Sequence, residues 1–251
     1  MAAPYLLRRA SIPNMAGILM FPIMLLGPSI AGIVMTRLAD GRKGLTDLRT
    51  RLFSVRVAPR YYAILLVPPI LVLTVLKGLE TFVSPMYAPN FFLIGVLFGV
   101  PAGFLEEIGW TGYALPKMVA RGNGFAASVL LGVVWSLWHL PVINFLGAAS
   151  PHGAYWFRFF LAFALAMTAM RVLIAWLHAH TRSILLAQLM HVSSTGVLVI
   201  FGAPRVNAVQ EAVWYATYGL ALWIVVGVMV RFFGINSWSG DLQQSELVAT
   251  R

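Results

Sequence analysis

The amino-acid sequence predicts an all-α protein, a polytopic bundle of about seven or eight transmembrane helices. Three observations support this fold class. Of the 251 residues, 60% are hydrophobic and only 10% are charged, whereas soluble proteins carry about 25% charged residues. Apolar runs long enough to cross a bilayer recur along the chain. Basic residues concentrate between alternate runs, as they do in the cytoplasmic loops of membrane proteins.

The apolar runs predict seven spans within a single membrane-embedded domain, residues 1–251. The first run, which starts at Ile12, follows a basic pair but is long for a signal peptide, so we expect it to be retained as a span. The segment after the last run, residues 236–251, is predicted to be a mobile tail. We place the spans at residues 12–36, 61–76, 91–112, 125–146, 156–177, 183–202 and 212–231.

The net charge of +10 is explained by topology, which makes a nucleic-acid partner an unnecessary hypothesis. Seven basic residues lie in the segment 37–60 against only Asp40 and Asp47, so this segment is predicted to be cytoplasmic. Alternation then places the C-terminus in the cytoplasm of a multi-pass protein of the cell membrane. The pair Arg8–Arg9 fits this topology least well, because seven spans place it on the outer side of the membrane. An eighth span or a re-entrant segment would move the pair to the cytoplasmic side.

The predicted cytoplasmic segment carries leucines at helical spacing, Leu45, Leu48 and Leu52, among its arginines. This pattern suits a helix lying on an anionic membrane surface. A polar loop that only enforces topology is an equally good interpretation.

Two adjacent glutamates, Glu106 and Glu107, interrupt the third apolar run. A charged side chain at mid-bilayer depth costs several kcal/mol, roughly 2.5–3.5 on insertion scales. Neighbouring residues on a helix point about 100° apart, so at least one of the two should face the protein interior or a wet cavity. Such residues are functional-site candidates, and the question is which residues accompany them.

The turn around Asn123 brings a histidine to the depth of the glutamates. If the chain folds there as an antiparallel hairpin, Glu106 lies 17 residues before the turn and His139 lies 16 after it. At about 1.5 Å per residue, both are roughly 25 Å along their helices from Asn123. The spacing therefore predicts that Glu106 and His139 share one depth and one cavity.

A second candidate histidine, His191, lies eight residues inside the sixth span. Gln188, Ser194 and Thr195 can lie on the same helix face, at spacings of three and four residues. The remaining histidines, at positions 152, 178 and 180, lie near span ends and are interpreted as interfacial.

Two carboxylates and two imidazoles on three helices suit three chemistries. A carboxylate can activate water while histidine and hydrogen-bond donors stabilise an oxyanion. Glu106, His139 and His191 can instead hold Zn²⁺ with an open position. The same groups can relay protons in a carrier. The sequence contains neither HExxH nor GxSxG, so it gives no support to a zincin site or a serine nucleophile.

Together, the three segments resemble the CPBP family, the CAAX prenyl protease and bacteriocin-processing (Abi) proteins. The resemblance covers Glu106 to Gly196, within a core of about residues 91–202. The family has two glutamates followed by arginine after three intervening residues, an aromatic residue four positions before histidine, and histidine four positions before asparagine or aspartate. The matching segments here are EEIGWTGYALP at 106–116, WSLWH at 135–139, with Trp135 in place of the usual phenylalanine, and HVSST at 191–195.

The resemblance implies an intramembrane endopeptidase. Glu106 and His139 would activate water, Glu107 would support the site, and His191 would stabilise the oxyanion with Thr195. Thr111 and Thr195 depart from the family residues.

The departure at Thr111 removes the arginine that would pair with a glutamate. Arg171 or another base would have to supply the missing charge. Otherwise the two carboxylates would be protonated in part, because neighbouring carboxylates raise each other's pKa.

We therefore expect a peptidase that needs no cofactor and acts in the lipid bilayer on a peptide or membrane-protein substrate. A prenylated CAAX protein and a bacteriocin-like precursor are both compatible with the sequence. A catalytically inactive scaffold or chaperone is the main alternative, and it predicts that the glutamates can be replaced without loss of function. A proton-coupled carrier is a weaker one, because such proteins usually show internal repeats and none is visible.

Overall fold

A computed structural model describes residues 15–145, 152–202 and 206–239, and every regular element in these ranges is helical. The predicted all-α class is therefore confirmed. The helices are α2 (Met15–Leu52), α3 (Pro59–Ala63), α4 (Val67–Phe82), α5 (Val96–Gly109), α6 (Leu115–Val119), α7 (Gly124–Trp138), α8 (Leu140–Phe145), α9 (Trp156–Thr181), α10 (Ile184–Phe201) and α11 (Ala208–Phe233).

Within the described ranges, five helical segments are long and apolar enough to cross a membrane, against the seven or eight spans predicted for the whole chain. These five are Pro22–Leu52, Pro59–Phe82, Gly153–Thr181, Ile184–Phe201 and Ala208–Phe233. The predicted spans 91–112 and 125–146 also fall on helices, but on interrupted ones. A π-helical turn, Trp110–Ala114, separates α5 from α6, and α7 ends at Trp138 before the short α8.

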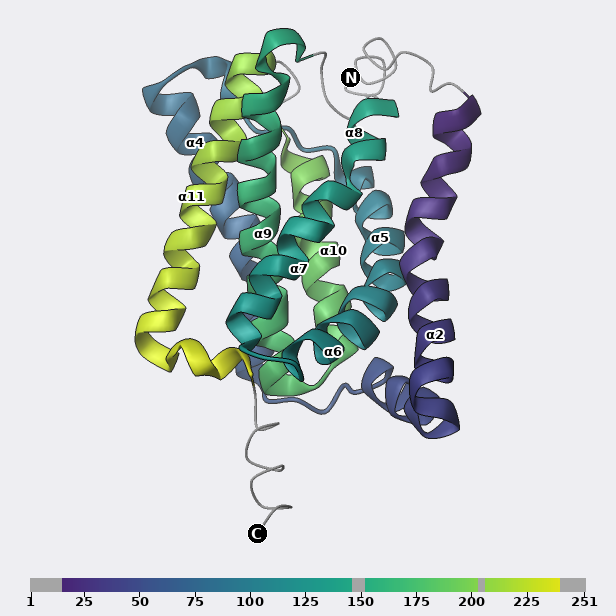
Figure 1. Cartoon of the computed structure of the whole chain (residues 1–251). Helices are drawn as coiled ribbons and strands as arrows, with labels where there is room; N and C mark the ends of the chain where they lie inside the picture. The colour runs from purple at the N-terminus through teal and green to yellow at the C-terminus, as the bar shows by residue number, and fades with distance from the viewer. Residues whose placement is uncertain (1–14, 146–151, 203–205, 240–251) are drawn as a thin grey trace.

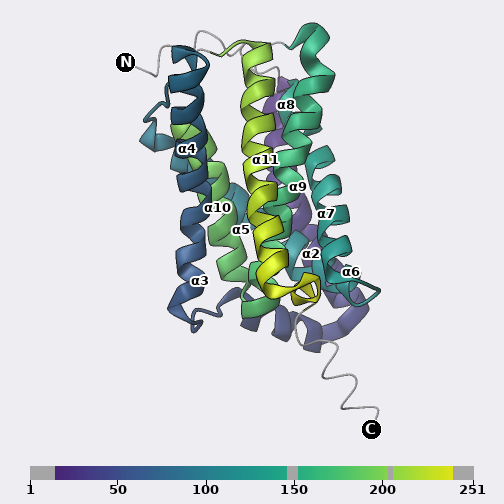
Figure 2. The ribbon, with the colours of Figure 1, turned by 90° about the vertical axis from the view of Figure 1, so that its left-hand side faces the viewer.

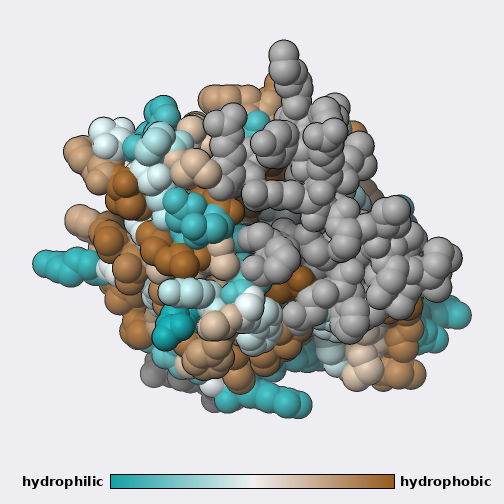
Figure 3. Space-filling model, turned by 90° about the horizontal axis from the view of Figure 1, so that it is seen from above, coloured by the Kyte–Doolittle hydropathy of each residue, from teal (hydrophilic) through white to brown (hydrophobic). Residues whose placement is uncertain are grey.

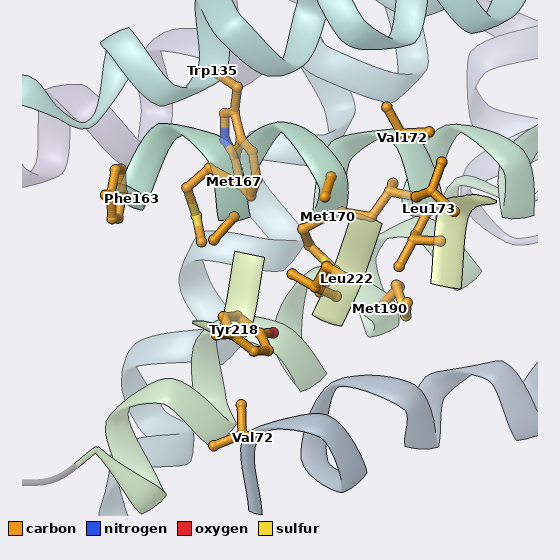
Figure 4. Packing of buried hydrophobic residues seen from close by; sticks show 14 of the residues in the cluster. Val72, Trp135, Phe163, Met167, Met170, Val172, Leu173, Met190, Tyr218 and Leu222 are labelled. Atoms are coloured by element: carbon orange, nitrogen blue, oxygen red, sulfur yellow. The ribbon is translucent and has the colours of Figure 1, made fainter. Parts of the chain in front are cut away.

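Helix α9 runs through the centre of the bundle, surrounded by α7, α10 and α11 (Figures 1 and 2). Its side chains are buried around the whole circumference, which explains why its sequence is apolar without a polar face. Figure 4 shows Met167, Met170 and Leu173 of α9 among side chains from the surrounding helices. These partners are Trp135 of α7, Met190 of α10, Leu222 of α11 and Val72 of α4.

Large apolar side chains on the outer helices point away from the protein. Ile30 of α2, Phe82 of α4, Leu97 of α5 and Ile224 of α11 are all exposed. Figure 3, viewed from the upper end in Figure 1, shows hydrophobic side chains along the left-hand and lower edges of the molecule. These flanks suit contact with lipid tails.

Helices α5 and α10 approach closely, and this contact carries two site-bearing helices. A Cβ atom at Gly103 would lie 2.7 Å from the Gln188 carbonyl oxygen and 2.8 Å from the Val192 nitrogen. Only glycine permits such backbone proximity, as at the small-residue interfaces of membrane helices. The contact sets Glu106 and Glu107 of α5 beside His191 of α10.

Helix α2 continues beyond the predicted first span to Leu52 through a bend at Gly41, where φ is 66°. The residues after the bend are therefore helical, which agrees with the surface-helix interpretation of the leucine spacing and not with a polar loop. The predicted tail begins too early, because Trp238 is buried and its indole donates to the Val172 carbonyl oxygen at 2.9 Å. Arg8–Arg9 and residues 240–251 lie outside the described residues.

One end of the bundle collects most of the described lysines and arginines, and we call it the basic end. It holds the chain from Arg37 to Arg60, the α6–α7 turn, the α9–α10 turn and the C-terminal end of α11, at the bottom of Figure 1. The opposite end carries only Lys77 and Arg158 among the described basic residues outside the bundle interior.

Candidate active site

Glu107 lies at the centre of a fully buried ionic group. Arg171 of α9 donates two hydrogen bonds to its carboxylate, Nη1 to Oε2 and Nη2 to Oε1, each 2.8 Å. Both side chains are 0% exposed. His191 Nδ1 lies 2.8 Å from Oε1, and the Thr111 hydroxyl donates to Oε2. Three helices, α5, α9 and α10, thus converge on one carboxylate, which keeps it ionised without contact to water.

Thr111 reaches Glu107 because the helix continues past α5 as a π-helical turn. The turn Trp110–Ala114 follows directly after Gly109, and Thr111 lies four residues after Glu107. Arg171 Nη1 also lies 3.4 Å from the Thr111 hydroxyl oxygen. π-Helical turns inside helices often mark functional sites. Position 111 is therefore one at which a longer basic side chain would compete directly with Arg171 for Glu107.

Glu106 occupies a different environment although it is the next residue. Its Oε2 accepts hydrogen bonds from two indole nitrogens, Trp110 Nε1 at 3.2 Å and Trp135 Nε1 at 3.1 Å. The residue is 4% exposed. Within the described residues, no lysine, arginine or histidine nitrogen lies at ion-pair distance from its carboxylate. The Glu106 carboxylate is therefore free to accept a proton. The Glu107 carboxylate is not, because it is bound to the Arg171 guanidinium.

The indole of Trp135 organises the space between the predicted residues. Its ring meets the rings of His139 and His191 edge-on, each with a centroid distance of 5.0 Å. The Arg171 guanidinium also contacts the Trp135 ring, with its carbon 4.2 Å from the ring centroid in a cation–π contact. Glu106 and His139 thus both contact this indole, and in the described part of the chain no hydrogen bond joins them directly.

The hydrogen bonds of both imidazoles fix their tautomers. His139 Nδ1 lies 2.7 Å from the Trp135 carbonyl oxygen, which can only accept, so Nδ1 carries a proton. His191 Nδ1 donates in the same way to the Glu107 carboxylate. Each ring is left with Nε2 as the nitrogen that can accept a proton or act on a substrate.

Thr195 lies one turn after His191 on α10 and is half-buried. No hydrogen bond joins its hydroxyl to another site residue in the described part of the chain. Gln188 faces α5 instead and donates to the Phe104 carbonyl oxygen at 2.8 Å. Of the predicted residues, Glu106, His139 and His191 therefore contact Trp135. Glu107 joins them through His191 and Arg171, and the role of Thr195 stays a prediction.

The residues do not converge as a metal site. Over the described ranges, no group of three histidine, cysteine, aspartate or glutamate side chains is arranged to hold a metal ion. Both imidazoles already use Nδ1, and the Trp135 ring lies between them. The Zn²⁺ hypothesis for Glu106, His139 and His191 gains no geometric support, and we derive no step through a metal.

Sequence reasoning missed the two tryptophan donors and only raised Arg171 as one option. The signal for Arg171 was present, because it is an arginine far from either end of the predicted span 156–177. The signal for Trp135 was its replacement of phenylalanine in the resemblance motif. An indole can donate a hydrogen bond to Glu106, whereas a phenyl ring cannot.

The interfacial interpretation of the other histidines is only partly right, since two of them are buried in the protein. His152 stacks on Phe159 with centroids 3.7 Å apart and lies 3.1 Å from a Glu211 carboxylate oxygen. His178 is buried among α9 neighbours at the basic end. His180 is half-buried, and its Nδ1 lies 2.9 Å from the Trp176 carbonyl oxygen.

Comparisons with known proteins point to the same part of the chain. Residues 88–197 match the family model described as "Type II CAAX prenyl endopeptidase Rce1-like". This range contains every predicted site residue. The CAAX prenyl protease 2 of Methanococcus maripaludis is 29% identical over 184 residues, which is 66% of this chain and 66% of the relative. The match thus covers slightly less than two thirds of the relative. The core of the chain, residues 88–197, is thus similar to the Rce1-like type II CAAX prenyl endopeptidases.

Proposed function

We propose that this protein is an intramembrane endopeptidase that hydrolyses a peptide bond with water activated by Glu106. The observation that carries the proposal is the contrast between the two glutamates. Glu107 is saturated by Arg171, His191 and Thr111. Glu106 has only indole donors on Oε2. A carboxylate without a cation, beside two oriented imidazoles, suits general-base chemistry.

In the proposed reaction, Glu106 takes a proton from water, and His139 assists through Nε2. The water oxygen bonds to the carbonyl carbon of the scissile peptide, and the carbonyl electron pair moves onto its oxygen. His191, when its ring carries a proton on both nitrogens, keeps Nδ1–H on Glu107 and donates Nε2–H to this oxyanion, with Thr195 as the second donor. Collapse of the intermediate breaks the C–N bond, and the proton held by Glu106 passes to the departing amine.

Glu107, Arg171 and Thr111 act as positioning residues in this scheme. They do not touch the reacting atoms. The Glu107 carboxylate orients His191 by accepting from Nδ1, as second-sphere carboxylates orient catalytic histidines. Arg171 keeps that carboxylate charged and fixed.

We also propose a seven-span topology in the cell membrane with a cytoplasmic C-terminus. The continuous helical stretch from α5 through the π-helical turn to α6, together with α7, would add two crossings to the five long apolar segments. Both helices are apolar but interrupted, α5 by the π-helical turn after Gly109 and α7 by its end at Trp138. Each helix alone is therefore shorter than a bilayer crossing needs.

The substrate is proposed to be a peptide or a membrane protein presented within the bilayer. The relative from Methanococcus maripaludis is named a CAAX prenyl protease, so prenylated C-terminal CAAX peptides are the first substrate class to test. Unprenylated peptides form the comparison class.

The test is cleavage of prenylated and unprenylated peptide libraries by the purified protein in nanodiscs. Glu106→Gln keeps the side-chain shape and removes the base, so cleavage should fall below detection, while His139→Ala and His191→Ala should each lose roughly 10² or more. Glu80→Gln is the matched control, since this carboxylate lies on α4 and pairs with Lys77. Full cleavage by the Glu106→Gln protein would refute the proposal, and loss of cleavage with chelator would restore the metal hypothesis.

A further inference from the structure

The second part of α2 leaves the direction of the bundle. Gly41, with φ 66° and ψ −152°, bends the chain, and the following helical residues 42–52 lie across the basic end (Figure 2). We call residues 42–52 the basic leg. The candidate span in α2, Pro22–Leu52, has 31 residues, whereas a bilayer needs about 20. The basic leg is therefore the excess that emerges at the membrane surface.

The basic leg is docked on the turn that follows the glutamates. Leu48 is buried, and a Cβ atom at Gly112 would lie 2.7 Å from Leu48 Cδ1. Arg51 Nη2 donates to the Gly112 carbonyl oxygen at 3.1 Å. Just before the bend, Asp40 accepts from Lys117 Nζ at 2.6 Å. These contacts hold the leg in one orientation against the protein.

The face of the basic leg that points away from the protein carries uncompensated charge. Arg42, Lys43 and Arg49 are exposed. Among the described residues, no carboxylate lies within ion-pair distance of any of the three. Both nearby acids are already paired, Asp40 with Lys117 and Asp47 with Arg51. The leg thus presents a positive surface without an internal counter-charge.

Two further features at the same end indicate what covers this surface. Burial and the neighbouring Arg51 guanidinium hold the pKa of Arg182 below its usual value, so positive charge is crowded there. Directly after the leg, Phe53 is 72% exposed and Val55 is 55% exposed. Positive charge beside exposed apolar side chains matches a layer of anionic headgroups over acyl chains. A free phosphate ion or a polynucleotide offers no apolar phase for Phe53.

We propose that the basic leg binds the phosphodiester headgroups of anionic phospholipids through Arg42, Lys43 and Arg49, with Phe53 inserted among the acyl chains. Because Leu48 and Arg51 hold Gly112, lipid binding steadies the π-helical turn that carries Thr111 and, through Thr111, Glu107. This second consequence, a dependence of cleavage on anionic lipid, rests on the proposed peptidase function. The lipid binding itself does not.

Lipid binding is tested on the purified full chain in nanodiscs of phosphatidylcholine with spin-labelled phosphatidylglycerol or spin-labelled phosphatidylcholine as the probe. The unmodified protein should enrich the labelled phosphatidylglycerol roughly twofold in its motionally restricted shell, and high salt should reduce the enrichment. The combined substitution Arg42→Gln, Lys43→Gln and Arg49→Gln should bring the ratio to about one. The control Lys77→Gln with Arg158→Gln removes exposed charge at the opposite end and should leave the enrichment unchanged.

Three outcomes would overturn the lipid proposal: no preference for phosphatidylglycerol in the unmodified protein, full preference in the triple variant, or displacement of the labelled lipid by millimolar inorganic phosphate. The last would identify a free-phosphate site. The triple variant also touches no residue of the proposed catalytic group. If it loses lipid preference and keeps cleavage, the binding stands and its coupling to the site is refuted. If no protein cleaves any peptide, the lipid measurement still decides the binding.

Discussion

At the scale of single residues, adjacent carboxylates acquire different chemistry from their neighbours. Glu107 is completely buried but remains charged, because a bidentate guanidinium and an imidazole replace the water it has lost. Glu106 keeps only uncharged donors. A buried carboxylate whose cation is removed loses several kcal/mol of stabilisation, about 3–5 in measured cases, so the arrangement depends on Arg171 more than on any other residue.

Because the site depends on Arg171, moving its positive charge to position 111 is a test of this role, which we call charge relocation. Arg171→Met should destabilise the protein, reduce cleavage by roughly 10² or more, and release His191 from its orientation. Adding Thr111→Arg to Arg171→Met should recover a substantial part of both properties. Position 111 already contacts Glu107 and lies beside the Arg171 guanidinium. Thermal unfolding and cleavage rates of the two proteins give the comparison.

The useful control for charge relocation is Arg158→Met, which removes an exposed arginine stacked on Tyr155 at the opposite end. It should leave both stability and cleavage near the values of the unmodified protein. If Arg171→Met cleaves at the normal rate, or if Thr111→Arg gives no recovery of stability, Arg171 does not serve as the counter-charge of Glu107.

Thr195 supports a second residue-scale prediction. Thr195→Asn introduces the amide found in the resembling family and should give equal or higher activity, because the amide offers a longer-reaching donor. Thr195→Val preserves the shape and removes the hydroxyl, so kcat should fall by roughly 10² if that hydroxyl binds the oxyanion. Unchanged kcat in the valine variant would remove Thr195 from the mechanism.

The glutamates and both site histidines were predictable because a polar group in an apolar run is costly and therefore conspicuous. Their partners were harder to predict. The pairing of Arg171 with Glu107 joins residues 64 positions apart, and the sequence offered Arg171 only as one base among several. The indole between Glu106 and His139 was not predicted either, because depth along two helices does not specify which side chain fills the space between them.

At the scale of elements, the site depends on how closely α5 and α10 pack. The glycines of α5 let the α10 backbone approach, and this distance sets whether His191 reaches Glu107. The apolar runs predicted both helices. Neither the close contact nor the π-helical turn after Gly109 could be read from periodicity, since both arise from packing against residues distant in the chain.

Gly103→Ala should therefore be destabilising although alanine favours helices. The new methyl group would lie within 2.8 Å of the α10 backbone, and overpacking of this kind costs about 1–3 kcal/mol. The shift should also separate His191 from Glu107 and lower cleavage. Gly78→Ala in α4 is the matched control, because nothing lies within 4 Å of its new methyl group.

For Gly78→Ala, helix propensity predicts a stabilisation of roughly 0.5–1 kcal/mol and unchanged cleavage. Thermal unfolding of both variants in the same nanodisc separates the two effects. Equal unfolding temperatures for Gly103→Ala and Gly78→Ala would show that the α5–α10 interface can open without loss, and that His191 is held by other contacts.

At the scale of the whole molecule, charge and apolar surface together define an orientation. The flanks expose large apolar side chains, and basic residues gather at the end where α2 bends and α11 finishes. The site lies on α5, α7, α9 and α10, of which α5 and α7 are the interrupted helices. Each of the seven predicted spans overlaps helical residues, two of them on interrupted helices, and length and composition identify five helical segments of the described chain as able to cross a membrane.

The orientation gives the last prediction. The chain has no cysteine, so single cysteines report their side of the membrane without background. Thr46→Cys lies in the basic leg and Thr81→Cys lies near the opposite end of α4, and both positions are exposed. Because basic segments stay in the cytoplasm, an impermeant thiol reagent should label Thr81→Cys in intact cells, and Thr46→Cys only after permeabilisation. Labelling of Thr46→Cys in intact cells, with Thr81→Cys protected, would invert the topology and place the basic leg against the outer leaflet.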